Sequence, residues 1–237
     1  MSQDIVIERF FETIVSGARP EARRLIEEQS HLGVSAQTLI TDLFWPTYEM
    51  VEKLNREDQI TSMGYHLSTR LLRVLVDQNA SDLLSRIETP PVGRTVFAAC
   101  GPDEGSELGA QMGVDLLESH GFRMRFSGGG VPADEIQNLV QQDQPDVLLM
   151  FCSAPSDLPH VRMIIDNLHE IGACEHTQIA VGGGVFNRAD GLAEEIGADL
   201  WATEPLELVQ MLLEEPETRA TEDQRTVGRK RRLPKAA

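Results

Sequence analysis

Apolar residues follow two different periods along the chain. In the first part they recur every three or four positions, as Phe10 and Ile14 do, which is the spacing of a helix with one apolar face. Four such stretches predict a four-helix bundle over residues 1–88. Ser35 is expected to cap the start of the third helix, and Pro46 to kink that helix.

The segment Glu88-Thr-Pro-Pro-Val-Gly93 separates this part from a region with a different pattern. Beyond it, short β-rich runs alternate with helical stretches, which predicts a parallel sheet covered by helices on both faces. We therefore expect an α/β domain over residues 93–215, flavodoxin-like or Rossmann-like, with a doubly wound sheet of five strands. The expected strands are residues 95–100, 122–126, 146–152, 178–181 and 199–202.

The charge is distributed unevenly. The whole chain carries −17, but residues 216–237 hold seven basic and three acidic residues, so this tail is +4 and the rest is −21. An acidic body argues against nucleic acid as the main partner, because phosphate binding needs a basic face. The tail has almost no apolar residues and is expected to be disordered. Its run Arg229-Lys-Arg-Arg232 is either a solvated segment or a contact for RNA, an acidic partner or the acidic body.

The apolar runs and the cysteines indicate the cellular compartment of the protein. The longest apolar runs are far shorter than the ~20 residues that a membrane-spanning helix needs, so no membrane association is expected. The first residues show no basic region followed by an apolar core, as a secretory signal would. Cys100, Cys152 and Cys174 form neither a disulfide framework nor a zinc-binding spacing. We expect a cytoplasmic protein.

Four loops rich in glycine or small residues follow the expected strands. In an open parallel sheet, ligands bind beyond the carboxyl ends of the strands, where the strand order reverses. For the order 2-1-3-4-5, that crevice lies beside the loops after strands one and three. Glycine in such loops lets a ligand approach the backbone closely, so a large flat ligand or one with an extended tail would fit. The four loops are residues 100–109, 127–132, 152–156 and 181–186.

Three of these loops carry motifs in a fixed order, which are Glu104-Gly-Ser-Glu-Leu-Gly109, Ser153-Ala-Pro155 and Gly182-Gly183. The set resembles the DxHxxG, SxL and GG pattern of the cobalamin (vitamin B12)-binding domain family, found in corrinoid proteins and B12-dependent transcriptional regulators. Intervals of 43 residues between the first two motifs and 26 between the last two are similar to the family's. The bundle resembles the helical cap of these proteins, so the resemblance covers about residues 20–215 and implies cobalamin as cofactor.

The resemblance also assigns roles to residues. It implies that the nucleotide tail of cobalamin inserts beside the first strand, in a pocket lined by Gly109, Ser153, Gly182 and Gly183. Pro155 stands where SxL has its leucine. The corrin would lie between Glu104–Ser106 and the bundle near His66.

Two departures concern the axial ligands of cobalt. In the family, the histidine of DxHxxG is the lower ligand and the aspartate orients it, but here Ser106 and Glu104 occupy these positions. A bound cobalamin would therefore keep its own base or a water below the cobalt, unless the pocket has lost the cofactor. Both residues also have structural interpretations, Ser106 as a helix N-cap and Glu104 as a solvated acid near a helix N-terminus.

His66 is the one residue kept from the Trp, Glu and His that face the corrin in the light-sensing regulators, where this chain has Asn55, Tyr65 and His66. It is a candidate upper cobalt ligand, or else an ordinary packed or surface histidine.

These observations favour a cobalamin-binding sensor or regulatory protein without catalytic activity of its own, with the corrin held between the cap and the sheet edge. One alternative is a corrinoid carrier that shuttles methyl groups between partner enzymes, although such carriers normally keep the lower histidine. Another is a protein-interaction module with a degenerate pocket. A protein partner or a homo-oligomer is expected in addition to the corrinoid.

Overall fold

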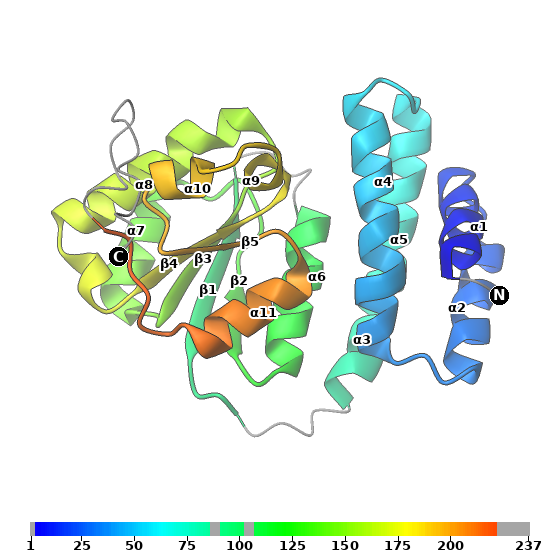
Figure 1. Cartoon of the computed structure of the whole chain (residues 1–237), viewed down its shortest axis with the longest axis horizontal. Coiled ribbons are helices and arrows are strands. Elements are labelled where there is room, and N and C mark those ends of the chain that lie inside the picture. Colours follow the sequence, from blue (N-terminus) through cyan, green and yellow to red (C-terminus); the bar gives the residue numbers. More distant parts are fainter. Residues whose placement is uncertain (1–2, 86–90, 102–106, 222–237) are drawn as a thin grey trace, which may run out of the picture. The chain divides into compact units, whose positions relative to one another are not determined.

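The computed structural model describes residues 3–85, 91–101 and 107–221, apart from the side chain of Cys174. The chain divides into two compact units, Met1–Pro90 and Pro91–Ala237 (Figure 1). Among the helices of these described ranges, none has both the length and the apolar composition needed to cross a bilayer.

The first unit is helical, as the period of its apolar residues predicts. Helix α1 packs against α2, α4 and α5, and α4 packs against α5. The core includes the fully buried rings of Phe10 and Phe44, whose centroids are 5.8 Å apart. Its elements are α1 (Gln3–Val15), α2 (Arg19–His31), α3 (Ala36–Leu39), a π-helical turn (Ile40–Phe44), α4 (Trp45–Arg56) and α5 (Ser62–Ser85).

Two local features of the third predicted helix depend on single residues. The hydroxyl of Ser35 accepts a hydrogen bond from the backbone N–H of Thr38 at 3.0 Å, which confirms the predicted N-cap. The irregularity expected at Pro46 takes the form of the π-helical turn directly before it. Proline has no N–H to donate and its ring crowds the carbonyl four residues earlier, so the regular hydrogen-bond ladder is interrupted here.

The second unit contains the predicted five-stranded parallel sheet, in the order β2-β1-β3-β4-β5. Every residue of β3 and β4 is buried, which explains why these strands are nearly continuous apolar runs. The α/β class and the doubly wound sheet are confirmed. The strands are β1 (Thr95–Cys100), β2 (Arg123–Phe126), β3 (Val147–Phe151), β4 (Gln178–Gly182) and β5 (Leu200–Ala202).

Helices cover both faces of this sheet (Figure 1). Helices α6 and α11 pack together on one face. On the other face, α7, α8 and the short α9 and α10 enclose a core with side chains of β1, β3 and β4. The helices are α6 (Glu107–Ser119), α7 (Ala133–Asp143), α8 (Leu158–Glu170), α9 (Gly184–Arg188), α10 (Leu192–Glu195) and α11 (Pro205–Glu214), with 3₁₀ turns at Pro155–Asp157 and Ala173–Glu175.

Residues 216–221, which belong to the expected tail, run along the amino ends of β4 and β5. The side-chain amide of Gln178 donates hydrogen bonds to the carbonyls of Glu215 at 2.8 Å and Thr218 at 2.9 Å. The backbone N–H of Ala220 donates to Asp199 Oδ1 at 2.6 Å. The remainder of the tail, with its basic run, lies outside the described residues.

Candidate functional site

The carboxyl ends of the central strands form the topological switch point of the sheet. Strand β1 lies between β2 and β3, so the connections that leave β1 and β2 run in opposite directions across the sheet. Gly101, the first residue after β1, donates its backbone N–H to the carbonyl of Phe151 at the end of β3, at 2.8 Å. The loops after β1 and β3 therefore meet where open α/β sheets bind their ligands.

Gly183 lets the loops after β3 and β4 touch. Its φ is +107°, and a Cβ at this position would lie 2.3 Å from the carbonyl oxygen of Cys152. By contrast, a Cβ on Gly182 would first meet the ring of Phe151 at 3.4 Å. Packing between these two loops therefore explains why residue 183 is a glycine. The contact of Gly183 with a ligand stays a prediction.

Asp157 is a residue of this edge that the sequence analysis did not identify. It is fully buried at the start of α8, and its Oδ2 accepts hydrogen bonds from the backbone N–H groups of Ser153 at 3.2 Å and Ala154 at 3.0 Å. Its Oδ1 is buried without a hydrogen-bond partner in the part of the chain that the structure describes. In the sequence, Asp157 could be noticed only as an aspartate at the start of a predicted helix and four residues after Ser153. The same pattern also indicates an ordinary helix N-cap.

The end of β1 touches this carboxyl group directly. A Cβ on Gly101 would lie 2.7 Å from Asp157 Cγ, so no larger residue fits at Gly101 without a shift of the aspartate. Asp157 consequently lies between the loops after β1 and β3, at the switch point itself.

The loop after β2 is tied to the start of α6. Glu107 Oε1 accepts a hydrogen bond from the backbone N–H of Gly129 at 2.9 Å, and a Cβ on Gly128 would lie 2.7 Å from the same oxygen. Packing against Glu107 therefore explains the glycine at position 128.

The predicted site residues fall into three groups. Glu104 and Ser106 lie outside the described residues. Gly109 is buried in the first turn of α6, Ser153 and Pro155 lie in the turn between β3 and α8, and Gly182 and Gly183 lie at the end of β4. This second group follows three strands that end at the same sheet edge. Arg188 links two of its loops by donating to the carbonyl of Ser153 at 2.6 Å.

His66 belongs to the other unit. It lies on an exposed position of α5, and its ring makes an edge contact with the ring of Tyr65, with centroids 5.8 Å apart. The Tyr65 hydroxyl donates a hydrogen bond to Glu52 at 2.8 Å, and burial together with this carboxylate raises the pKa of Tyr65. Tyr65 is therefore held in place beside an accessible imidazole.

The two cysteines at the strand ends are structural. Cys100 and Cys152 are both buried, as the sequence predicts, and burial, with smaller contributions from Asp157 and Cys100, raises the pKa of the Cys152 thiol. Among the described residues, no group of three or more His, Cys, Asp or Glu side chains is arranged to hold a metal ion.

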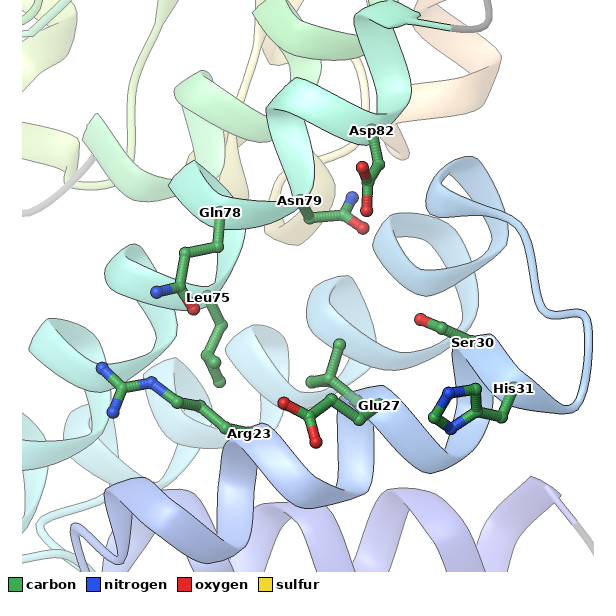
Figure 2. Close-up of a pocket in the computed structure, with 9 residues that line it drawn as sticks. Arg23, Glu27, Ser30, His31, Leu75, Gln78, Asn79 and Asp82 are labelled. Carbon is green, nitrogen blue, oxygen red and sulfur yellow. The ribbon is translucent and has the colours of Figure 1, made fainter.

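A polar groove of about 450 Å³ lies between α2 and α5 in the first unit (Figure 2). Arg23, Glu27 and His31 line it from α2, while Gln78 and Asp82 line it from α5. Its charges are of both signs, and none of the predicted site residues is part of it.

Residues 94–210 match the family model of the B12-binding domain. This part of the chain belongs to that family, and its cofactor is cobalamin, as the ordered motifs predict.

Particular relatives can be named. The dimethylamine corrinoid protein 1 of Methanosarcina acetivorans is 27% identical over 103 residues, which are 44% of this chain and 47% of that protein. The match thus spans about half the length of this relative. The monomethylamine corrinoid protein of Methanosarcina barkeri has the same fold, with a TM-score of 0.78 and 18% identity over 90% of this chain and 99% of that chain.

A methanol:cobalamin methyltransferase complex from the same organism gives a TM-score of 0.49 at 18% identity, covering 93% of this chain and 83% of that one. This agreement is too low to support an argument.

Two features of the carboxyl edge bear on its fit to cobalamin. Its loops are brought together at the switch point by Gly101 and Gly183, whose Cβ positions are taken by Asp157 and by the Cys152 carbonyl. It also holds a buried carboxylate oxygen without a donor among the described residues, and the hydroxyl and amide groups of cobalamin are such donors.

Proposed function

We propose that this protein is a corrinoid carrier, which holds cobalamin and presents it to partner enzymes for methyl transfer. The observation that carries the proposal is the sequence match, over 103 residues, to a protein named as a dimethylamine corrinoid protein. That match covers 47% of the relative, so the methyl donor and the partner enzymes are themselves part of the proposal. When bound, cobalamin supplies a cobalt that accepts and gives up a methyl group.

The residues of the second unit would hold the nucleotide part of the cofactor. Gly109, Ser153, Gly182 and Gly183 follow the carboxyl ends of β1, β3 and β4, and Pro155 shapes the turn before α8. Backbone N–H groups and the Ser153 hydroxyl are the polar contacts that these loops offer.

The lower face of the corrin is proposed to lie near Glu104 and Ser106. A serine hydroxyl is a much weaker ligand for cobalt than imidazole, so cobalamin bound here keeps its own base or a water as the lower ligand. This distinguishes the protein from carriers in which a histidine supplies that ligand.

His66 is proposed as a contact of the upper face. Its exposure on α5 leaves the imidazole accessible, and the neighbouring Met63 and Leu67 are exposed to 69% and 41%, so the surface around it is partly apolar. An apolar surface beside an imidazole suits a flat macrocycle better than a fully charged helix face does.

The carrier replaces the sensor as our main interpretation because the sequence relative is named as a corrinoid protein and not as a regulator. The two functions differ in what they require of the bound cofactor. A carrier must let a methyl donor reach the cobalt repeatedly, whereas a sensor needs only to retain the cofactor and change its contacts with a partner.

This difference gives the test. The purified full chain is loaded with hydroxocobalamin and desalted. Each cycle consists of reduction with titanium(III) citrate, methylation by methyl iodide, and photolysis in air, which cleaves the Co–C bond and oxidises the released methyl group. Visible spectra are recorded after each step through several cycles. We expect about one cobalamin per chain and complete methylation in each cycle without loss of cofactor. A retained cofactor that resists methylation would support the sensor, and a chain that retains no corrinoid would support the degenerate pocket.

A further inference from the structure

The unpaired oxygen of Asp157 is costly for the apo protein. A buried polar atom without a hydrogen bond loses its water without compensation, and the loss is larger for a charged group. An asparagine at this position would accept the same two hydrogen bonds from the N–H groups of Ser153 and Ala154 through its single carbonyl oxygen. Local structure therefore explains Oδ2 but not Oδ1.

The position of the carboxyl group points to a ligand. It lies against Gly101 at the switch point between β1 and β3, where a Cβ on Gly101 would lie 2.7 Å from Asp157 Cγ and 2.9 Å from Oδ2. The described residues supply no donor to Oδ1. A ligand that binds at this edge and carries an N–H or O–H group would satisfy it.

We propose that Asp157 Oδ1 accepts a hydrogen bond from the nucleotide part of the corrinoid, so that this residue selects complete cobamides over corrinoids that lack the nucleotide. The inference rests on the proposed placement of the nucleotide at this sheet edge. The donor is either a ribose hydroxyl or, in a cobamide with a purine base, the amino group of that base. The nucleotide phosphate is an anion without a proton to donate, so the carboxylate does not face it.

The substitution Asp157→Asn tests this role with little change in shape. The new carbonyl oxygen keeps both backbone hydrogen bonds, while an NH₂ group replaces the free oxygen and meets the donor of the ligand with a second donor. Asp166→Asn is the matched control, because it removes the same charge from the exposed face of α8, the helix that follows Asp157, where Asp166 pairs with Arg162.

Three corrinoids are titrated into the full chain and both variants, and affinity is read from visible spectra and calorimetry. Cobalamin offers ribose hydroxyls, adeninylcobamide adds the amino group of its base, and cobinamide lacks the nucleotide. The melting temperature of each apo protein is measured in parallel.

We expect Asp157→Asn to weaken cobamide binding by about tenfold or more, since hydrogen bonds to charged groups are the stronger ones, and to leave cobinamide binding unchanged. Its apo melting temperature should equal or exceed that of the wild type, and Asp166→Asn should bind as the wild type does. A loss for both cobamides assigns the ribose hydroxyl as donor, and a loss for adeninylcobamide alone assigns the base.

An equal loss for cobinamide, or no loss for either cobamide, would overturn the inference while leaving the proposed function intact. A wild-type chain that binds none of the three corrinoids would overturn both.

Discussion

Two buried aspartates at opposite edges of the same sheet are built differently. At the amino edge, Asp199 accepts a hydrogen bond on each oxygen, from Ile179 N–H at 2.7 Å and Ala220 N–H at 2.6 Å. At the carboxyl edge, Asp157 accepts hydrogen bonds on one oxygen, and the other has no partner among the described residues. Burial is nearly the same for the two, at 5% and 0% exposed.

The difference separates a structural edge from the proposed binding edge. At the amino edge, Gln178 and Asp199 fasten the segment after α11, and Asp146 accepts two hydrogen bonds from Thr95. Hydrogen-bonding capacity there is used within the protein. At the carboxyl edge the loops are held together by close contacts at glycines, and one acceptor has no partner among the described residues.

The largest effect is expected for Gly183→Ala. The new Cβ would overlap the Cys152 carbonyl and force a residue with a side chain to adopt φ near +107°. We expect the free energy of unfolding to fall by about 3 kcal/mol, measured by urea denaturation. Gly93→Ala is the control, because Gly93 has φ +81° and nothing within 4 Å of its Cβ position, so it should cost about 1 kcal/mol. Equal costs would show that the contact between the loops is not tight.

Truncation tests the amino edge. A chain ending at Glu214 loses the hydrogen bonds from Gln178 and leaves Asp199 Oδ1 without its donor. Its free energy of unfolding should fall by about 2–3 kcal/mol. A chain ending at Thr221 keeps these bonds and should unfold within about 0.5 kcal/mol of the full chain. A large loss in the second truncation would mean that residues beyond Thr221 stabilise the domain.

Asparagine at the two buried aspartates should have opposite effects. In Asp199→Asn, one of two backbone N–H donors meets an NH₂ group, so we expect a loss of about 2 kcal/mol in the apo protein. In Asp157→Asn, both backbone bonds are kept and an unpaired charge is removed, so stability should stay the same or rise. The contrast between the edges fails if both substitutions destabilise equally in chemical denaturation.

The smallest effect concerns the pH dependence of stability. Burial raises the pKa of Asp146, but hydrogen bonds from Thr95 outweigh it and leave the pKa below its ordinary value. A depressed carboxyl pKa adds stability that is present above the unfolded value and is lost as the pH falls through the folded value. Asp146→Asn should therefore flatten the loss of stability below about pH 4, as followed by thermal melts between neutral and acidic pH. If stability fell with pH as steeply as in the wild type, other groups would cause the loss of stability at acidic pH.

Sequence patterns predicted the architecture well for physical reasons. Apolar periodicity reports which face of an element is buried, so the bundle and the strands could be placed, and Ser35 was recognised because a cap depends on its immediate neighbours. The order 2-1-3-4-5 was one of two that doubly wound sheets commonly adopt, and in both the loops after the strands meet at one edge.

The chemical roles of individual residues could be predicted less well from the sequence. Asp157 resembles any N-cap in sequence, and its place at the switch point depends on packing against Gly101, which lies 56 residues away along the chain. Gly183 was predicted only as a ligand contact, and its structural role could not be foreseen, because its positive φ and its contact with Cys152 arise only when two loops pack together. Such features depend on tertiary contacts, and a local pattern does not contain them.

Hydrogen exchange with and without hydroxocobalamin tests most directly whether the cofactor binds at the carboxyl edge of the sheet. The full chain is exchanged in both states, and peptides over residues 151–157 and 182–188 are compared with those over 212–221. We predict slower exchange on cofactor binding in the first two segments and no change in the third. Protection at residues 212–221 alone, or none in the segments after β3 and β4 when cobalamin is bound, would contradict this placement.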